Sequence, residues 1–481
     1  MIARKENASA SSLGVFARWC TGLRFGDLPE EAVTAVRNDI RDALGCALYG
    51  SRLPWSRTML ETFLWDAAGA GRAGVWGTNA RLPGTLASLV NASFVQSFEL
   101  DSMHQLASLH AGSTMLPAVL ALAEQGVPVV GQADGKAGGH GAVSGERLFI
   151  AMAVGWELGT RVALCGGPSL TKGWHTPTIN GTFSAAAAAG VALGLDATRM
   201  THCLGLAALQ ASGILAVQYG GDAKRLYAGK ASQAGLQAAL LAARGYSAPP
   251  DVMECAPGGL LPTFAGSDGS FDASKLTEGL GKSWAASGIG FKLYATCAPN
   301  LSSVDLVRGF QKTHGLRVQD VESISAHVGA DSFHHVGWTY TPGDVTAAQF
   351  SLQYAIAVAL IEGDAFVEQY RPELMADLRI LDMVKRISIV EDPTITRQGR
   401  IARNSARLRV VLKSGEVLQN EVMIPRGNAT NPASEAELHS KFERLARTAL
   451  SPSRIEDISW ELARLESVES VAGLAGMLAV G

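Results

Sequence analysis

Residues 182–195 read TFSAAAAAGVALGL, a run without a charged residue in which alanine and glycine outnumber the larger side chains. Alanine is the strongest helix former, so the run predicts a helix over 183–193. Small side chains on its inner face would let neighbouring helices approach closely. The run is too short for a membrane span, which needs about 20 residues. We therefore expect a core helix of a globular protein and no membrane association.

Helical spacing extends on both sides of this run, from about residue 11 to residue 270. Leu13, Phe16, Ala17 and Cys20 recur at i, i+3, i+4 and i+7, as on the buried face of a helix. Further helices are predicted over residues 32–44, after an opening at Pro29-Glu30-Glu31, and over 85–99, 114–125, 148–164 and 231–244. Six glycines between residues 131 and 145 predict a flexible loop.

The pattern changes after about residue 275. Strands are predicted over 321–328, 384–390, 406–412 and 417–424, with a hairpin turn at 413–416 and helices over 302–311 and 346–360. Residues 434–480 are helical in pattern again. The predicted fold is therefore mostly α with a smaller α+β part. A large all-helical domain, residues 1–275 and 430–481, would carry an inserted α+β domain, residues 276–429, with a ligand-binding cleft at the junction.

Charge is low and unevenly distributed. The chain has 481 residues, is 47% hydrophobic and 18% charged, and has a formal charge of −3. This composition argues against disorder and against a protein that coats nucleic acid, which would need a basic surface. Only 16 of the 151 residues in 85–235 are charged. We expect this stretch to form the packed centre, covered by another domain or subunit.

The six cysteines, at positions 20, 46, 165, 203, 255 and 297, form no CxxC pair. They are expected to be reduced, buried thiols of a cytoplasmic protein. The N-terminus has early basic residues but no apolar segment behind them, which is unlike a secretory signal.

Four segments carry residues that could perform chemistry. Residues 99–112 gather Glu99, Asp101, His104 and His110; the others carry His175, the pair Lys224-Arg225, and the group Lys292, Tyr294 and Cys297. Each also has a structural interpretation, as a core histidine, a solvated turn or an interface residue. Metal binding by His104 and His110 is disfavoured, because a spacing of six does not place both on one helix face. Together, cations and histidines in a dry cleft would suit a small polycarboxylate.

The same segments resemble the MmgE/PrpD superfamily, and its fungal-type cis-aconitate decarboxylases in particular. The matching stretches are SRLPWS (51–56), ELDSMHQLASLHA (99–111), KGWH (172–175), QYGGDAKRL (218–226), FKLYATC (291–297), HVGW (335–338) and QFSLQYAIAVAL (349–360). The resemblance implies a helical domain with an α+β lid domain, a homodimer, no organic cofactor, and an active site between the domains. No metal is expected, because a zinc site would need clustered ligands and the sequence shows none.

The resemblance also implies site residues. His110, His175 and Lys224 stand at motif positions, as do Lys292, Tyr294 and Cys297 in the lid motif. The chain departs from the family pattern at Ser102, where an aspartate is usual, at Met103, where a polar residue is usual, and at Leu301, where many members carry histidine.

The expected function is a cofactor-independent carbon lyase, a decarboxylase or dehydratase, acting on a small di- or tricarboxylate such as cis-aconitate or a 2-methylcitrate analogue. His110 and His175 would be the acid/base pair, with His104 a third candidate. Lys224, with Lys292 or Arg225, would hold carboxylates, while Glu99 or Asp101 would orient a histidine or bind substrate; Tyr294 and Cys297 would line the site. Two alternatives stay open: an epimerase or isomerase on the same fold, and a non-catalytic binding protein.

Overall fold

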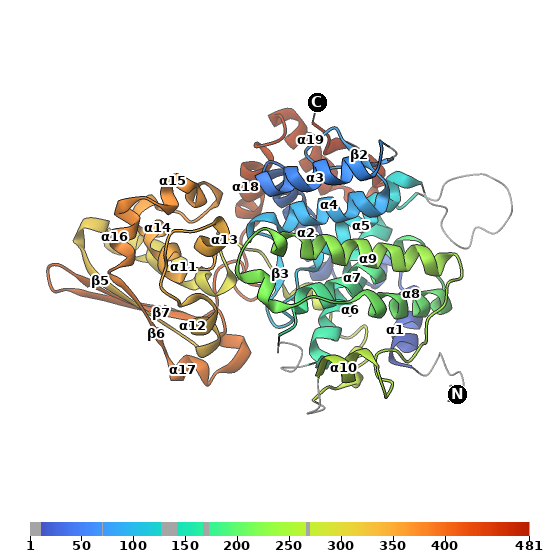
Figure 1. The fold of residues 1–481 in the computed structure, drawn as a ribbon, viewed down its shortest axis with the longest axis horizontal. Coiled ribbons are helices and arrows are strands. Elements are labelled where there is room, and N and C mark those ends of the chain that lie inside the picture. The colour runs from blue at the N-terminus through green and yellow to red at the C-terminus, as the bar shows by residue number, and fades with distance from the viewer. Residues whose placement is uncertain (1–10, 70, 127–141, 167–172, 266–269, 481) are drawn as a thin grey trace.

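The computed structural model describes residues 11–69, 71–126, 142–166, 173–265 and 270–480. Two lobes are visible in Figure 1. The larger lobe is helical, and the smaller one contains a four-stranded sheet with helices packed on it. The protein is thus mostly helical with a small sheet part.

Helix α7 (Thr176–Ala192) lies at the centre of the larger lobe, where α5 (Ala111–Gln125), α6 (Gly145–Gly166) and α9 (Leu226–Ala243) pack against it. Glycines on the neighbours allow this close approach. A Cβ added at Gly235 of α9 would lie 2.5 Å from the Cβ of Ala185, and one at Gly159 of α6 would lie 2.0 Å from the Oγ of Ser184. The prediction of a core helix with close contacts is confirmed.

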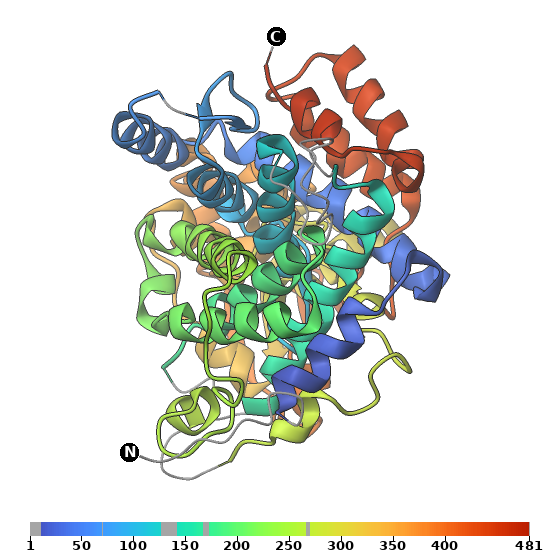
Figure 2. The same cartoon turned by 90° about the vertical axis from the view of Figure 1, so that its right-hand side faces the viewer.

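The remaining helices of this lobe come from both ends of the chain. They are α1 (Ser12–Thr21), α2 (Glu30–Gly50), α3 (Pro54–Asp66), α4 (Gly84–Val95), α8 (Ala197–Gln210), α10 (Leu260–Ala265), α18 (Glu435–Ala446), α19 (Pro452–Ala463) and α20 (Ala472–Met477). Helix α18 packs against α2, so the last segment returns to the first helices, as Figure 2 shows. A capping box at Ser434 and Glu437 begins α18.

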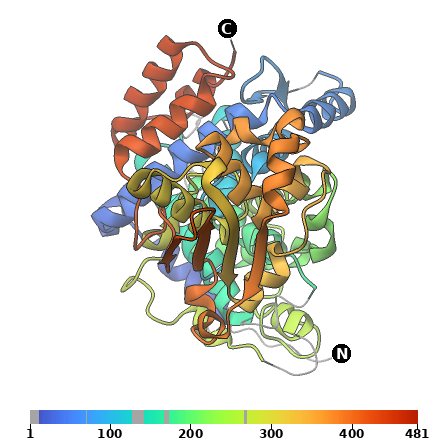
Figure 3. The same cartoon turned by 90° about the vertical axis from the view of Figure 1, so that its left-hand side faces the viewer.

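The sheet of the smaller lobe has the order β6-β5-β7-β8. Strand β5 (Val321–Val328) runs parallel to β6 (Ile387–Glu391) and antiparallel to β7 (Ala406–Leu412), which pairs with β8 (Val417–Val422). Figure 3 looks onto this lobe. Its helices are α11 (Leu301–His314), α12 (Ala330–Val336), α13 (Val345–Gln349), α14 (Leu352–Glu362), α15 (Pro372–Met375), α16 (Leu378–Val384) and α17 (Pro393–Thr396).

Two-residue strands and short 3-10 helices complete the described structure. The strands are β1 (Ala73–Gly74), β2 (Arg81–Leu82), β3 (Met103–His104) and β4 (Ile289–Gly290). The 3-10 helices are η1 (Phe25–Asp27), η2 (Gln96–Phe98), η4 (Leu215–Tyr219), η5 (Ala223–Arg225), η6 (Ala273–Leu276), η7 (Ala285–Gly288), η8 (Ala298–Asn300), η9 (Val318–Asp320), η10 (Val367–Tyr370), η11 (Gly399–Ala402) and η12 (Leu465–Ser467).

Several predicted bounds need correction. The strand predicted from residue 384 begins at Ile387, because α16 extends to Val384. The helix predicted over 346–360 is two helices, since the Ser351 hydroxyl accepts a hydrogen bond from the N–H of Tyr354 and begins α14 anew. The strand predicted to residue 424 ends at Val422. The hairpin turn is confirmed, with Leu412 donating to the carbonyl of Glu416.

Most of the glycine-rich loop predicted over 131–145 lies outside the described residues. The exact domain division at residues 275 and 429 stays a prediction. All six cysteines are free thiols, and five of them are buried.

Helix α6 bears on the expectation of no membrane association. Helix α6 has 22 residues and is long and apolar enough, by length and composition, to cross a membrane. However, 89% of its most apolar window is buried inside the protein. It is the one such helix among the described residues.

Candidate active site

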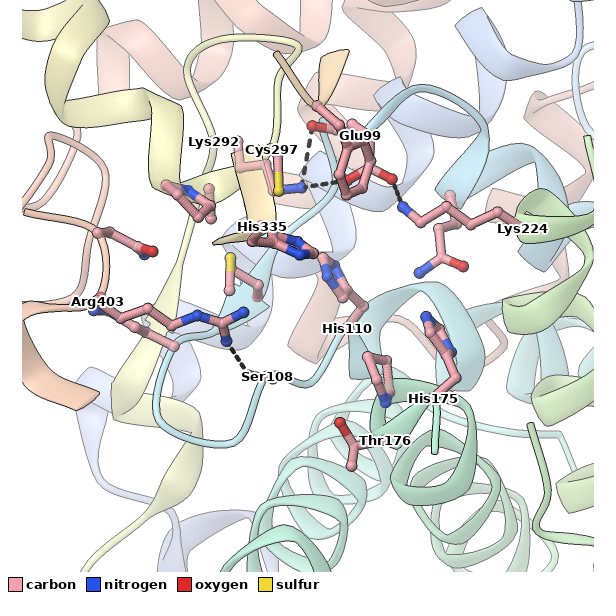
Figure 4. Close-up of a pocket in the computed structure, with 18 of the residues that line it drawn as sticks. Glu99, Ser108, His110, His175, Thr176, Lys224, Lys292, Cys297, His335 and Arg403 are labelled. Carbon is pink, nitrogen blue, oxygen red and sulfur yellow. Dashed lines mark hydrogen bonds and ion pairs between the residues drawn. The ribbon is translucent and has the colours of Figure 1, made fainter. Parts of the chain in front are cut away.

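A cavity of about 190 Å³ contains most of the residues singled out in the sequence. Figure 4 shows them pointing toward a common space. The larger lobe lines it with Gln96, Glu99, Met103, Gln105, Ser108, His110, Trp174, His175, Thr176, Pro177, Leu215 and Lys224, and the rest of the chain with Lys292, Cys297, Ala298, Pro299, His335, Phe350, Arg403 and Asn404.

Packing of four helices brings the key side chains of the larger lobe together. Glu99 follows α4 and its 3-10 extension, His110 directly precedes α5, His175 directly precedes α7, and Lys224 lies just before α9. These helices pack against one another, so their ends converge on the cavity although the residues are far apart in sequence.

Three cationic side chains surround the carboxylate of Glu99. The Lys224 ammonium contacts Oε1 directly, Arg225 Nη1 lies 3.3 Å from Oε1, and Lys292 Nζ lies 3.5 Å from Oε2. Lys292 also donates to the Glu99 carbonyl at 3.1 Å. Glu99 has φ +53°, a left-handed conformation that costs a non-glycine residue roughly 1 kcal/mol or more. The cluster holds more potential positive than negative charge, so an anionic ligand would complement it.

Burial explains the titration behaviour of the cluster. It lowers the pKa of Lys224 well below its usual value, and the neighbouring Arg225 and Lys292 charges lower it further, while contact with Glu99 acts in the opposite direction. Burial also lowers the pKa of Arg225 to about 10. The ring of Phe350 covers Lys224 at 4.8 Å. These cations are therefore poorly hydrated, which strengthens any contact with a carboxylate.

His110 is paired with a buried carboxylate behind the cavity. Its Nδ1 lies 3.0 Å from Oδ2 of Asp101 and 3.0 Å from the carbonyl oxygen of Ser102. Burial alone would raise the pKa of Asp101, but the nearby His110, Lys292 and Lys441 lower it overall. An ionised Asp101 fixes the ring so that its other nitrogen is the one available to a ligand.

His175 lies in a different setting. Its Nδ1 is 2.6 Å from the Thr178 hydroxyl, and its ring stacks on Tyr227 with a centroid distance of 4.1 Å. Burial, and the charge on His110, lower the pKa of His175 to about 3. His175 is therefore a neutral imidazole at neutral pH.

Lys292 and Cys297 line the cavity as predicted. Cys297 is buried, and burial raises the pKa of its thiol despite the nearby Lys292 and Lys224 charges. The thiol is thus largely protonated at neutral pH.

Four predicted site residues do not line the cavity. Asp101 and Arg225 lie behind it, in contact with His110 and Glu99. The hydroxyl of Tyr294 instead donates a hydrogen bond to Asp305 Oδ1 at 2.8 Å.

His104 lies in β3, which pairs with β4. Its ring packs closely on Gly288: a Cβ added at Gly288 would lie 2.4 Å from Nε2 of His104. Burial lowers the pKa of His104 to about 4, as for a neutral core histidine.

Two prominent cavity residues were missed. His335 packs against the ring of Phe350, and burial together with the Arg403 and Lys224 charges lowers its pKa to about 3. His335 opens the quoted stretch HVGW, so its position there was an available signal. Arg403 stands between two short elements in a segment with many arginines, and nothing local in the sequence distinguishes it.

Among the described residues, no group of three or more His, Cys, Asp or Glu side chains is placed to hold a metal ion. The prediction that the protein uses no cofactor is not tested by this arrangement.

The fold and cavity define a mostly helical protein with a small mixed sheet and a buried pocket rich in cations and imidazoles. The chain belongs to the MmgE/PrpD family: residues 14–272 match the MmgE/PrpD N-terminal domain, and residues 294–464 match the C-terminal domain.

Named proteins are similar in sequence to this chain over nearly its whole length. The chain is 29% identical to a cis-aconitate decarboxylase-like protein of Aspergillus oryzae, over 96% of this chain and 95% of that protein. It is 29% identical to the cis-aconitate decarboxylase of Aspergillus terreus, over 98% of this chain and 97% of that protein. It is 23% identical to the human cis-aconitate decarboxylase, over 96% and 93% of the two chains.

Proposed function

We propose that this protein is a carbon lyase that acts on a small di- or tricarboxylate, with decarboxylation as its principal reaction. One observation carries the proposal: Lys224 and Lys292, which contact Glu99, line the same cavity of about 190 Å³ as His110, which Asp101 contacts from behind. Drug-sized ligands occupy pockets of roughly 300–1,000 Å³, so this volume favours a small substrate. The names of the fungal and human relatives support the same reaction class.

Substrate binding would use the excess positive charge of the cluster. A carboxylate placed beside Lys224 and Lys292 would supply the negative charge that Glu99 alone does not provide. In a poorly hydrated site, this contact would also fix the orientation of the carbon skeleton.

Decarboxylation breaks the bond between a carboxylate and its neighbouring carbon, and CO2 leaves. The electron pair of that bond stays with the carbon skeleton as carbanion or enolate character, which Lys224 and Lys292 would stabilise. The protonated imidazole of His110 would deliver a proton to that carbon, with Asp101 holding the charged ring in place. The pair would then be reprotonated from solvent.

Dehydration would use the same parts differently. His175, held neutral by burial, would take a proton from carbon, and His110 would protonate the departing hydroxyl.

An epimerase or isomerase is a second candidate, because His110 and His175 reach the cavity from the ends of two different helices. Two proton carriers on opposite faces of one carbon suffice for that reaction.

We further propose that the smaller lobe acts as a lid, since it supplies His335 and Arg403 to the cavity. Homodimer formation and a cytoplasmic location stay predictions.

The test is incubation of the pure protein with cis-aconitate, 2-methylcitrate and citrate, followed by CO2 measurement and proton NMR in deuterated water. CO2 release with one deuterium in the product is expected. Loss of water without CO2 would indicate a dehydratase, and deuterium exchange without either loss would indicate an isomerase. Binding of these acids without any conversion would overturn the enzymatic proposal and favour a binding protein.

A further inference from the structure

Arg403 reaches the cavity from the smaller lobe, and the proposed function assigns it no role. Its Nη1 donates to the hydroxyl of Ser108, in the larger lobe, at 2.9 Å. Its Nε is buried without a hydrogen-bond partner. Among the described residues, no carboxylate oxygen lies within 4.0 Å of its guanidinium. A guanidinium in such a place usually binds a carboxylate through two parallel hydrogen bonds.

The backbone that carries Arg403 is firmly held. The Ser332 hydroxyl donates to the carbonyl oxygen of Arg403 itself. The Ser302 hydroxyl donates to the next carbonyl, that of Asn404, at 2.5 Å. The N–H of Ser405 donates to the carbonyl of Ala402 at 3.0 Å. The backbone from which the side chain extends is therefore fixed, and the Ser108 contact restricts the guanidinium, which reduces the entropy lost when it binds a ligand.

The partner of Arg403 in this structure is a weak one. Ser108 is neutral and offers a hydroxyl oxygen as acceptor. It also has φ +48°, a conformation that is unfavourable for a residue other than glycine. Arg400 Nη2 lies 3.4 Å from the same hydroxyl. A charged carboxylate would be a stronger acceptor for Arg403 than this hydroxyl, because its hydrogen bonds are charge-assisted.

Figure 4 shows Arg403 and Ser108 on one side of the cavity and Lys224 with Glu99 on the other, with His335 and His110 between them. We propose that Arg403 binds a second carboxylate of the substrate, at the end of the cavity opposite Lys224, and so selects ligands that carry a carboxylate at each end. The inference rests on the proposed function and specifies its substrate class. Ser108 would hold the guanidinium in place when no ligand is bound.

Calorimetric binding of two unreactive ligands tests this assignment. Propane-1,2,3-tricarboxylate has a carboxylate at both ends of its five-carbon chain, and methylsuccinate is the same molecule with one of these two carboxylates replaced by hydrogen. The unmodified protein is expected to prefer the tricarboxylate. In Arg403→Gln, affinity for the tricarboxylate should fall by about 10- to 100-fold, while affinity for methylsuccinate should change by less than about 3-fold.

Two further variants separate binding from structure. Ser108→Ala removes the hydroxyl but keeps the guanidinium, so it should retain the preference for the tricarboxylate; a purely structural contact would make it behave like Arg403→Gln. Arg409→Gln removes one exposed positive charge from β7 and should change neither affinity.

Four results would overturn the assignment. If Arg403→Gln keeps the preference for the tricarboxylate, the role assigned to Arg403 is wrong, while the proposed function is unaffected. Equal weakening of both ligands, or loss of preference in Ser108→Ala, would show that Arg403 acts on the site as a whole. Failure of the unmodified protein to bind either acid would overturn the proposed function as well.

Discussion

Nδ1 of His110 lies 3.0 Å from Oδ2 of Asp101, a carboxylate that is almost fully buried behind the cavity. The carboxylate belongs to the segment that follows α4, and the imidazole directly precedes α5. The chain between them forms a tight turn, in which the N–H of His104 donates to the carbonyl of Leu109 at 2.8 Å. The turn folds the segment back, so the imidazole of His110 and the carboxylate of Asp101 meet at the wall of the cavity.

The pair gives a direct test of the acid role of His110. Asp101→Asn keeps the size of the side chain and an acceptor oxygen but removes the charge. We expect kcat to fall by roughly 10- to 1,000-fold with a smaller change in KM, because the protonated imidazole loses its counter-ion. Steady-state kinetics on the converted acid would measure this. The control is Asp305→Asn, which changes a partly buried carboxylate that contacts Tyr294 outside the cavity and should retain kcat.

Lys224 tests the anion-stabilising cluster. Lys224→Ala should lower kcat/KM by roughly 10²- to 10³-fold, because one cation facing the developing negative charge is lost. The fold should survive, since Arg225 and Lys292 still neutralise Glu99. The control is Lys230→Ala. Lys230 is an exposed lysine on α9 that contacts Gln233, so its loss should leave turnover unchanged. Equal rates in the two variants would contradict the site assignment.

Asp39 should make stability depend on pH. Burial raises its pKa to about 7, although hydrogen bonds from Ser102 and from Trp156 Nε1, at 2.7 Å, act in the opposite direction. The unfolded carboxyl ionises near pH 4, so the unfolded chain binds fewer protons between pH 4 and 7. Folding therefore loses stability as pH rises through that window, by on the order of a few kcal/mol.

The substitution Asp39→Asn removes this titration. The Tm of the unmodified protein relative to Asp39→Asn should therefore be higher at pH 4.5 than at pH 7.5, as measured by thermal unfolding in a series of buffers. A Tm difference that is constant across the series would show that Asp39 keeps an ordinary pKa in the folded protein.

Lys441 connects the end of the chain to the wall of the cavity. Its ammonium lies 2.5 Å from Asp42 Oδ1 and donates to the carbonyl of Leu100 at 2.7 Å. Lys441→Met should lower the free energy of unfolding by about 3–5 kcal/mol, because it leaves Asp42 charged, buried and without this cation. The double variant Lys441→Met/Asp42→Asn should recover part of the loss in urea unfolding. No recovery would mean that the carbonyl contact, and not the ion pair, dominates.

Much of the secondary structure follows from local pattern. Helix α1 lies where Leu13, Phe16, Ala17 and Cys20 recur at helical spacing, and all four are buried. Strands β5 and β7 have the predicted bounds, since β-branched residues and a Gly415 turn define them locally. Where local signals compete, as between α16 and β6, the pattern of apolar residues does not mark the boundary, and the predicted strand began three residues early.

The site was predicted less completely. The motif segments contain Glu99, His110, His175, Lys224 and Lys292, and all five line the cavity. The same reasoning included His104, which is an equally good histidine by sequence but faces Gly288 in the core. It missed Arg403, which reaches the cavity because three hydrogen bonds hold its backbone segment, two of them from serines outside that segment.

The sequence by itself determined the helical core, the small sheet, the family and the set of segments that carry chemistry. These depend on periodicity, on small residues and on motif order, which are properties of neighbouring residues in the chain. Only the tertiary structure decided which side chains share the cavity and which lie behind it. The direction of a side chain depends on how helices that are distant in sequence pack against one another. Packing of α4, α5, α7 and α9 brings together Glu99, His110, His175 and Lys224. The smaller lobe adds Arg403 on the side of the cavity opposite Lys224.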